Sequence, residues 1–170
     1  NKYKMKSRGD DSLLFEVIKK NIVNYSYYFP FAFVKKRKFE FHKLEASAEN
    51  SLPLLMVLGT LNSQDCIITR VNFLKDRVKK QYQIMSRIFT KLSINNSSFD
   101  SEVVITPCKV KEKKQVDCEN DPYVAMAISM LAIMSDVPIV IKNAQCVYST
   151  NRDFYKMLTK FGVVIDFIYD

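Results

Sequence analysis

The sequence contains few of the residues that mark linkers, membrane spans or disulfide scaffolds. Among its 170 residues are 3 glycines, 5 prolines and no tryptophan, which leaves little composition for long flexible linkers. The longest apolar run, at residues 124–134, is shorter than the roughly 20 residues that a membrane span needs. No apolar segment follows the N-terminal lysines, so no signal peptide is predicted. We expect a single domain over residues 1–170 without a membrane span.

Paired metal-binding residues are also scarce. The four cysteines, Cys66, Cys108, Cys118 and Cys146, form no CxxC motif, and His42 is the single histidine. Zinc sites usually show Cys or His pairs at short spacing, and a chain of this size needs no disulfide framework. The sequence therefore predicts no metal, no cofactor and no catalytic histidine. It favours an intracellular, reducing compartment, with an organelle as one alternative.

Positive charge is the clearest excess in the composition. The net charge of +8 and the pI of about 9.3 favour an acidic partner such as nucleic acid, an anionic membrane surface or an acidic protein. A coding sequence rich in A and T, which favours Lys, Asn and Ile, explains the same excess without a partner. The candidate nucleic-acid-binding residues are Lys35, Lys36, Arg37, Lys38, Lys109, Lys111, Lys113 and Lys114. The plainer interpretation of such runs is a solvated face.

Apolar periodicity predicts alternating helices and strands. We expect helices at residues 12–21, 52–61, 77–92, 123–134 and 151–161. Strands are expected at 25–34, 39–44, 66–71, 103–106, 139–142 and 163–168, with a lysine-rich loop at 109–114. The expected helix caps are Asn50 or Ser51, Asp76, Asp121 followed by Pro122, and a Thr150–Asp153 capping box, with Gly162 after the last helix.

Two kinds of helix alternate along the chain. The helices at 52–61 and 123–134 are apolar nearly all round, which is typical of a helix buried on every side. The others carry lysines on one face. Equivalent helices recur at a period of roughly 65–75 residues, which indicates a duplicated unit of helices and strands. The expected fold class is α+β, with helices packed on sheets.

The segment from Asp121 to residue 161 carries a family resemblance. It contains Ala125-Met126-Ala127, then Ser135-Asp136-Val137-Pro138-Ile139, then Cys146 and Asp153-Phe154-Tyr155. This order resembles the closing segment of EPSP synthases. Ser51-Leu52-Pro53 and Arg8-Gly9-Asp10 resemble earlier motifs of the same family in the same order.

The resemblance implies a specific architecture. The family fold is two similar domains, each made of three βαβαββ units around buried parallel helices. We expect this chain to be most of the domain that holds the C-terminus. The sister domain would then lie elsewhere in the same protein or in another chain.

The resemblance also implies which chemistry to look for. The family adds a hydroxyl of shikimate 3-phosphate to phosphoenolpyruvate and expels phosphate, which requires carboxylates for proton transfer and cationic side chains for the anionic groups. The family's acidic positions fall on Leu54 and Val78, its arginines on Gln81 and Tyr123, and its last lysine on Ser149. A shifted register could bring Lys75, Arg77, Lys79 or Lys80 into phosphate contact, but Asp76 is the only acid in residues 73–85.

Two functions follow as hypotheses. The first is a catalytically inactive EPSP synthase-like domain that serves as a structural or interaction subunit, with protein partners in a larger assembly. A ribonucleoprotein such as an organellar ribosome would suit its charge and make RNA a partner. The second is a divergent part of a multidomain or split enolpyruvyl transferase. No residue is predicted to be catalytic, and the substrate-binding residues stay open.

Overall fold

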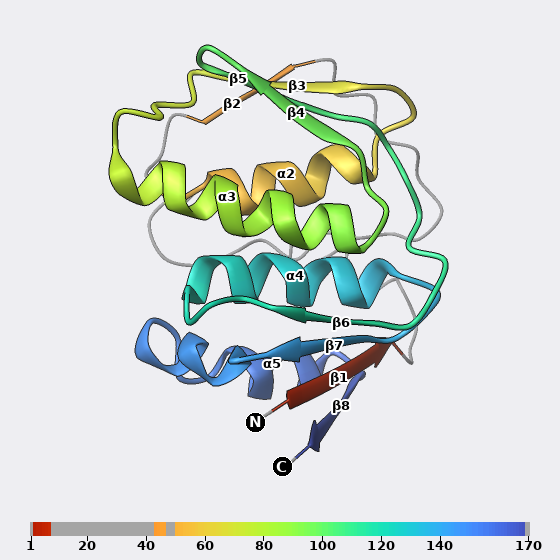
Figure 1. The fold of residues 1–170 in the computed structure, drawn as a ribbon. Coiled ribbons are helices and arrows are strands. Elements are labelled where there is room, and N and C mark those ends of the chain that lie inside the picture. The colour runs from red at the N-terminus through yellow and green to blue at the C-terminus, as the bar shows by residue number, and fades with distance from the viewer. Residues whose placement is uncertain (1, 8–42, 47–49, 169–170) are drawn as a thin grey trace.

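Three helices lie between two four-stranded sheets (Figure 1). The computed structural model describes residues 2–7, 43–46 and 50–168. One sheet has the order β2 (Lys43–Glu45), β3 (Cys66–Thr69), β5 (Glu102–Ile105), β4 (Asn96–Phe99). The other has the order β6 (Lys114–Asp117), β7 (Ile139–Lys142), β1 (Lys2–Ser7), β8 (Val163–Ile168). The helices are α2 (Leu52–Thr60), α3 (Asp76–Lys91), α4 (Pro122–Met134), the 3₁₀ helix η1 (Ala144–Ser149) and α5 (Phe154–Lys160).

The two sheets are built on one plan. In each, a parallel pair (β2 with β3, β6 with β7) is followed by two antiparallel neighbours. The first unit runs β2–α2–β3–α3–β4–β5, which is the βαβαββ order. The second runs β6–α4–β7–α5–β8, and β1 from the start of the chain takes the place that β5 has in the first unit. The expected fold class and the expected repeat are confirmed.

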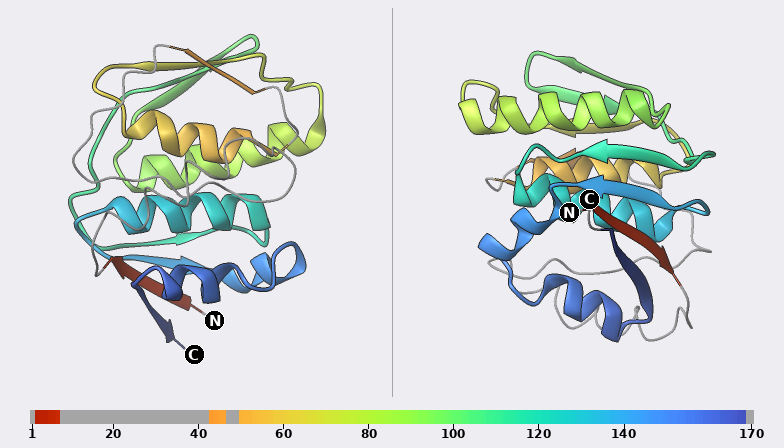
Figure 2. Two further views of the ribbon diagram at one scale, coloured as in Figure 1. Left: turned by 180° about the vertical axis from the view of Figure 1, so that it is seen from behind. Right: turned by 60° about the horizontal axis from the view of Figure 1, so that its bottom comes forward.

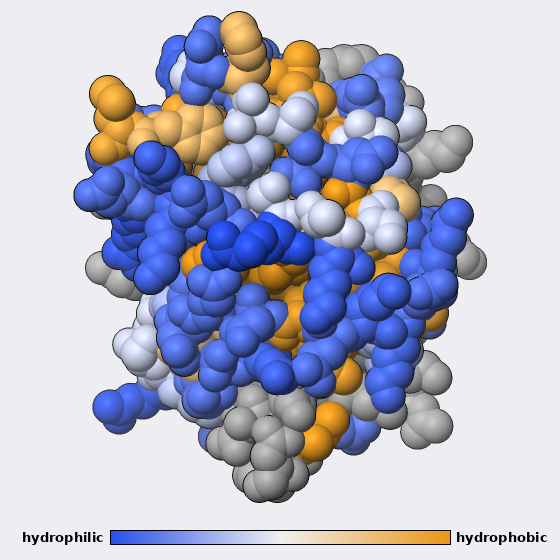
Figure 3. All heavy atoms as spheres, viewed as in Figure 1, coloured by the Kyte–Doolittle hydropathy of each residue, from blue (hydrophilic) through white to orange (hydrophobic). Residues whose placement is uncertain are grey.

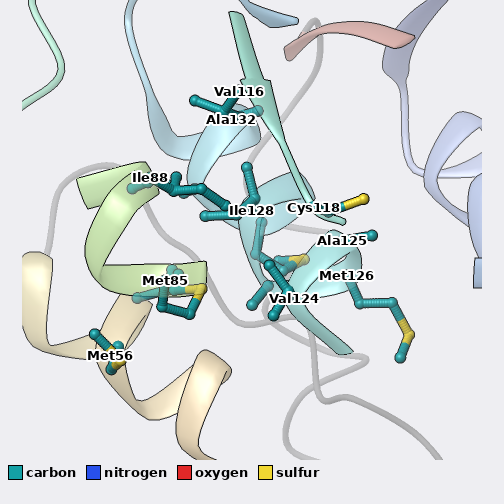
Figure 4. Close-up of a cluster of buried hydrophobic side chains, with 14 of the residues drawn as sticks. Met56, Met85, Ile88, Val116, Cys118, Val124, Ala125, Met126, Ile128 and Ala132 are labelled. Atoms are coloured by element: carbon teal, nitrogen blue, oxygen red, sulfur yellow. The ribbon is translucent and has the colours of Figure 1, made fainter. Parts of the chain in front are cut away.

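The core lies between the sheets. Ten consecutive residues of α4, from Val124 to Ile133, are buried, as a helix that is apolar all round predicts. Ile128 of α4 points toward Ile88 of α3, and Met56 of α2 faces Met85 (Figure 4). Seen from behind, α2 and α3 lie side by side beneath the first sheet (Figure 2). The outer face of α3 is hydrophilic (Figure 3), so its amphipathic pattern is also confirmed.

A glycine sets the distance between α2 and the first sheet. A Cβ built at Gly59 would stand 2.9 Å from the Cβ of Ile105 on β5, closer than real Cβ atoms approach other atoms. Gly59 therefore allows the α2 backbone to lie directly on β5. This contact presses the buried helix against its own sheet without an intervening side chain.

Most predicted elements are found, with shifted ends. Strands 139–142 and 163–168 match β7 and β8, and Asp121 caps α4 through its side chain as expected. The predicted cap Asp76 is wrong, because Lys75 holds the N-cap position and Asp76 is already helical. Ser51 holds the N-cap position of α2 without a side-chain cap bond.

The last helix departs further from its prediction. It begins at Phe154 and not at residue 151, because the preceding residues form η1 and a turn. The Thr150–Asp153 capping box is wrong, since Asp153 is the N-cap residue and makes no side-chain cap bond. Gly162 follows the helix with a φ of 81°, the left-handed conformation expected there.

The sequence pattern does not predict the strands β1, β4 and β6. β4 and β6 each form one edge of their sheet, and Lys114, which the sequence predicts to lie in a loop, opens β6. An edge strand exposes much of its length, so its sequence lacks the apolar alternation that marks a strand. The predicted helix 12–21 and strand 25–34, and most of strand 39–44, lie outside the described residues. Of the helices that are described, none combines the length and apolarity needed to cross a membrane.

Candidate functional site

The N-terminal ends of α2, α3 and α4 meet at one edge of the molecule, on the left of Figure 1. The Gln81 side chain connects them, because its Nε2 donates to Asn50 Oδ1 at 3.2 Å and to Asp121 Oδ2 at 3.3 Å. Asn50 precedes α2, Gln81 lies in the second turn of α3, and Asp121 caps α4. We call Asn50, Arg77, Gln81, Asp121 and Tyr123 the helix-end cluster.

Both carboxylate oxygens of Asp121 accept hydrogen bonds. Oδ1 accepts from the backbone N–H groups of Tyr123 at 2.9 Å and Val124 at 3.0 Å, and Oδ2 accepts from Gln81. The cap satisfies two of the free N–H groups at the start of α4, and the helix dipole favours the ionised carboxylate there. The geometry gives Asp121 a structural role.

Gln81 is a fully buried polar residue on the apolar face of α3. None of its surface is exposed, and its Oε1 has no hydrogen-bond partner among the described residues. A buried acceptor without a partner costs roughly 1–3 kcal/mol. Sequence reasoning noted Gln81 only as the position of an arginine in the family and missed its bridging role. Its place between the apolar positions Val78 and Ile84 was the available signal.

Arg77 and Tyr123 of the cluster are in contact with each other. The Arg77 guanidinium carbon lies 5.1 Å from the centroid of the Tyr123 ring, within the range of a cation–π contact. Arg77 is exposed and Tyr123 is half-buried. Such a contact at an exposed site contributes about 0.5–1 kcal/mol. The tyrosine thus places a cation at the helix ends, although its own side chain carries no charge.

The other positions taken from the family resemblance bring no acid or base to this edge. Leu54 is half-buried in α2, and Val78 is buried in the first turn of α3. Ser149 is exposed at the end of η1, where its Oγ donates to the backbone oxygen of Cys146 at 2.7 Å. Leucine and valine side chains cannot exchange protons. The structure therefore joins Gln81 and Tyr123 to one cluster, while Ser149 bonds locally.

The candidate nucleic-acid-binding residues fall into two groups. Residues 35–38 lie outside the described residues. Lys109 lies 3.9 Å from Asp136, and Lys114 lies 2.8 Å from Glu112. The hydrogen bond and positive charge of Lys114 hold the pKa of Glu112 below its usual value. Lys111 and Lys113 are exposed on the same loop. Their role in binding nucleic acid stays a prediction.

The described part of the chain holds no group of three or more His, Cys, Asp and Glu side chains that could bind a metal ion. His42, the single histidine, lies outside it. The cysteines at 118 and 146, by contrast, are in contact, with 3.9 Å between their Sγ atoms. Sequence spacing did not indicate this pair, because 28 residues separate the two.

Comparisons with known proteins agree on one group. No protein-family model matches the sequence. The chain is 24% identical over 160 residues to 3-phosphoshikimate 1-carboxyvinyltransferase of Clostridium novyi (strain NT), which covers 94% of this chain and 37% of that protein. The protein of the same name from Sulfurihydrogenibium sp. (strain YO3AOP1) is 29% identical over 113 residues, 65% of this chain and 26% of that protein.

Solved structures show the same fold. EPSP synthase from Acinetobacter baumannii superposes with a TM-score of 0.60 and 18% identity, over 69% of this chain and 28% of that chain. The enolpyruvyl transferase NikO from Streptomyces tendae gives a TM-score of 0.60 and 16% identity, over 77% of this chain and 30% of that chain. The chain thus spans between 26% and 37% of the length of these proteins.

Proposed function

Because the chain belongs to the EPSP synthase family of enolpyruvyl transferases, we propose that it is a non-catalytic domain of that fold, with a structural or interaction role in a larger assembly. One observation carries the proposal. The carboxylate at the helix ends, Asp121, is occupied as a helix cap and as the acceptor of Gln81. Proton transfer needs a carboxylate that can reach substrate, and this one already holds three donors.

The charges of the cluster support the same conclusion. A transferase that handles phosphorylated substrates needs cationic groups directed at the anions, and an arginine is the usual bidentate partner. In this chain the family's arginine positions hold Gln81 and Tyr123, and the nearby Arg77 stacks on the tyrosine ring. The edge is held together by these contacts, and none of them provides a general acid or base.

Phosphate release tests the absence of catalysis. The complete polypeptide that contains residues 1–170 is incubated with phosphoenolpyruvate and shikimate 3-phosphate, beside the related enzyme of Clostridium novyi as a positive control. We expect phosphate release no faster than in the enzyme-free reaction, with and without glyphosate. Turnover that glyphosate abolishes would overturn the proposal.

A second candidate function is a divergent part of a split or multidomain enolpyruvyl transferase. The match over 94% of the chain favours it, because the chain corresponds to only 37% of that relative and catalytic groups could come from the remainder. In that case Tyr123→Ala should raise the KM for shikimate 3-phosphate in the complete enzyme. A folded variant with unchanged KM would remove this candidate.

The proposed partner is a ribonucleoprotein, with an organellar ribosome as one example. The net charge of +8 and the exposed Lys111 and Lys113 support contact with a phosphate backbone. The test is a native pull-down of the tagged full-length protein with and without ribonuclease. We expect a defined particle that ribonuclease trims, and less RNA recovered with Lys111→Glu/Lys113→Glu.

A matched control is Lys156→Glu/Lys160→Glu, which makes the same charge change at exposed positions of α5. It should recover RNA as the native protein does. If the pull-down recovers the protein alone, or only with shikimate-pathway enzymes, the ribonucleoprotein proposal fails.

A further inference from the structure

We propose that Cys118 and Cys146 are a redox-active pair that closes reversibly to an intramolecular disulfide and so fixes η1 to the loop before α4. The pair lies outside the helix-end cluster, and the proposal stands whether or not the domain is catalytic. It assigns a modification site to two residues that have no role in the proposed function.

The geometry already brings the two sulfurs together. Their Sγ atoms are 3.9 Å apart, and a disulfide bond is about 2.05 Å long, so closure requires an approach of roughly 2 Å. The movement that the proposal requires is a rotation of the two side chains about their Cα–Cβ bonds. Cys118 lies where β6 ends, beside Ala125 of α4 (Figure 4), and Cys146 lies within η1.

A fixed scaffold holds the two loops that carry the cysteines. Asp117 Oδ1 accepts from the backbone N–H of Glu119 and from Asn143 Nδ2, each at 2.8 Å. The backbone N–H of Cys118 donates to the oxygen of Lys142 at 3.4 Å. The segment after Cys118 and the segment before Cys146 are therefore linked through groups other than the thiols. This arrangement keeps the sulfurs adjacent when they are reduced.

The two cysteines differ in access to solvent. Cys146 is half-buried and can meet an oxidant from solvent, whereas Cys118 is fully buried. The Cys118 thiol donates to the oxygen of Lys142 at 3.0 Å, or it turns toward Cys146. Donation from Cys118 to the Cys146 sulfur lowers the pKa of the Cys146 thiol, while the same contact and burial raise the pKa of Cys118. Cys146 is thus the attacking thiolate and Cys118 the resolving thiol.

The reaction with a disulfide oxidant such as glutathione disulfide is balanced. The Cys146 thiolate attacks one glutathione sulfur, the glutathione S–S bond breaks, and one glutathione thiolate leaves and takes up a proton. The Cys118 thiol then gives up its proton and attacks the Cys146 sulfur of the mixed disulfide, which releases the second glutathione. Two protein thiols are oxidised, and one glutathione disulfide is reduced to two glutathiones.

Thiol mapping in glutathione redox buffers tests the proposal on the full chain. After alkylation of the remaining thiols, we expect the oxidised protein to lose the mass of two hydrogen atoms and to give a linked peptide of Cys118 and Cys146. Dithiothreitol should reverse both changes. The oxidised form should also unfold at a higher temperature, by on the order of 5 °C, because the bond closes a loop of 28 residues.

Two variants separate this pair from a general thiol reaction. The Cys118→Ala variant should stop at the mixed disulfide between Cys146 and glutathione. The Cys108→Ala variant, which lacks another half-buried cysteine, should form the Cys118–Cys146 disulfide as the native chain does. Circular dichroism checks that both variants fold. A lasting glutathione adduct on the native chain, a bond to Cys66 or Cys108, or no loss of hydrogen would overturn the proposal. The mapping of the native chain decides this even if a variant fails to fold.

Discussion

At the scale of single residues, the helix-end cluster shows how a few polar groups join three helices. Gln81 is an α3 residue whose amide donates to Asn50 before α2 and to Asp121 at the start of α4. Each bond crosses between elements that are far apart in sequence. Asp121 also caps its own helix, so its carboxylate stabilises both a helix end and the packing between helices.

Removal of that carboxylate should cost stability. We expect Asp121→Ala to lower the free energy of unfolding by about 1–2 kcal/mol, because α4 loses its N-cap and Gln81 loses an acceptor. Asp121→Asn keeps a capping oxygen and should cost less than Asp121→Ala. Urea denaturation measures both differences.

Asp65→Ala is the matched control for that measurement. Asp65 is an exposed acid before β3, so its loss should change the free energy of unfolding by less than about 0.5 kcal/mol. Equal costs for Asp121→Ala and Asp65→Ala would show that the cap contributes nothing.

The pH dependence of cysteine alkylation is a second prediction at this scale. The hydrogen bond from Cys118 favours the Cys146 thiolate, so the pKa of Cys146 lies below its usual value. Alkylation by iodoacetamide should therefore persist to a lower pH than in a short cysteine peptide. Cys118→Ala removes the donor and should move the midpoint of the pH–rate profile upward. A midpoint that does not move would mean that Cys118 does not influence Cys146.

At the scale of elements, the second sheet depends on the start of the chain. β1 lies between β7 and β8, and its backbone at Met5 pairs in register with Ile139 of β7 and Ile165 of β8. Among the described residues, β1 is the strand on which β8 pairs. A strand from one end of the chain thus completes a unit formed by the other end.

Deletion of residues 1–7 tests this dependence. Without β1, β8 loses its ladder of hydrogen bonds while the β6–β7 pair stays intact. We expect amides of Val163–Ile168 to exchange with deuterated water much faster, and those of Ile139–Lys142 to keep most of their protection. Unchanged exchange in β8 would contradict the observed strand order.

The close contact at Gly59 gives a second prediction for the free energy of unfolding. Gly59→Ala gains helix propensity worth about 1 kcal/mol, but the new Cβ would stand 2.9 Å from Ile105 Cβ. Overpacking of a core costs roughly 1–3 kcal/mol, so we expect a net loss in the free energy of unfolding. Gln83→Ala, on the exposed side of α3, is the control and should be neutral. A stabilised Gly59→Ala protein would show that α2 moves away from β5 freely.

The sequence predicts helices and strands that have a clear cap or apolar run. It does not predict which distant residues are in contact. Asp121 and Pro122 fix the start of α4, and an apolar run fixes β7. The partners of β1, Gln81 and Cys118 lie tens of residues away, so no local pattern identifies them. The family resemblance places Leu54 and Val78 at acidic positions of the family, but it does not predict the bridging amide that joins the helices.

At the scale of the whole molecule, the chain has the layered repeat seen in solved EPSP synthases. It spans 37% of the length of its relative from Clostridium novyi. The N-terminal ends of α2, α3 and α4 meet at one edge of the molecule, where they are joined by a cap, an amide and a cation–π contact. The core of this repeat lies in its apolar helices, so the fold tolerates variation in the polar side chains at the helix ends.

The most direct test is calorimetric titration of shikimate 3-phosphate into the protein. A structural helix-end cluster predicts no saturable heat at millimolar ligand, since its cation, Arg77, stacks on the Tyr123 ring and neither Gln81 nor Tyr123 adds a second one for the phosphate. Saturable binding that Tyr123→Ala abolishes in a folded variant would contradict the account, because it would show that the cluster still recognises the substrate of the family.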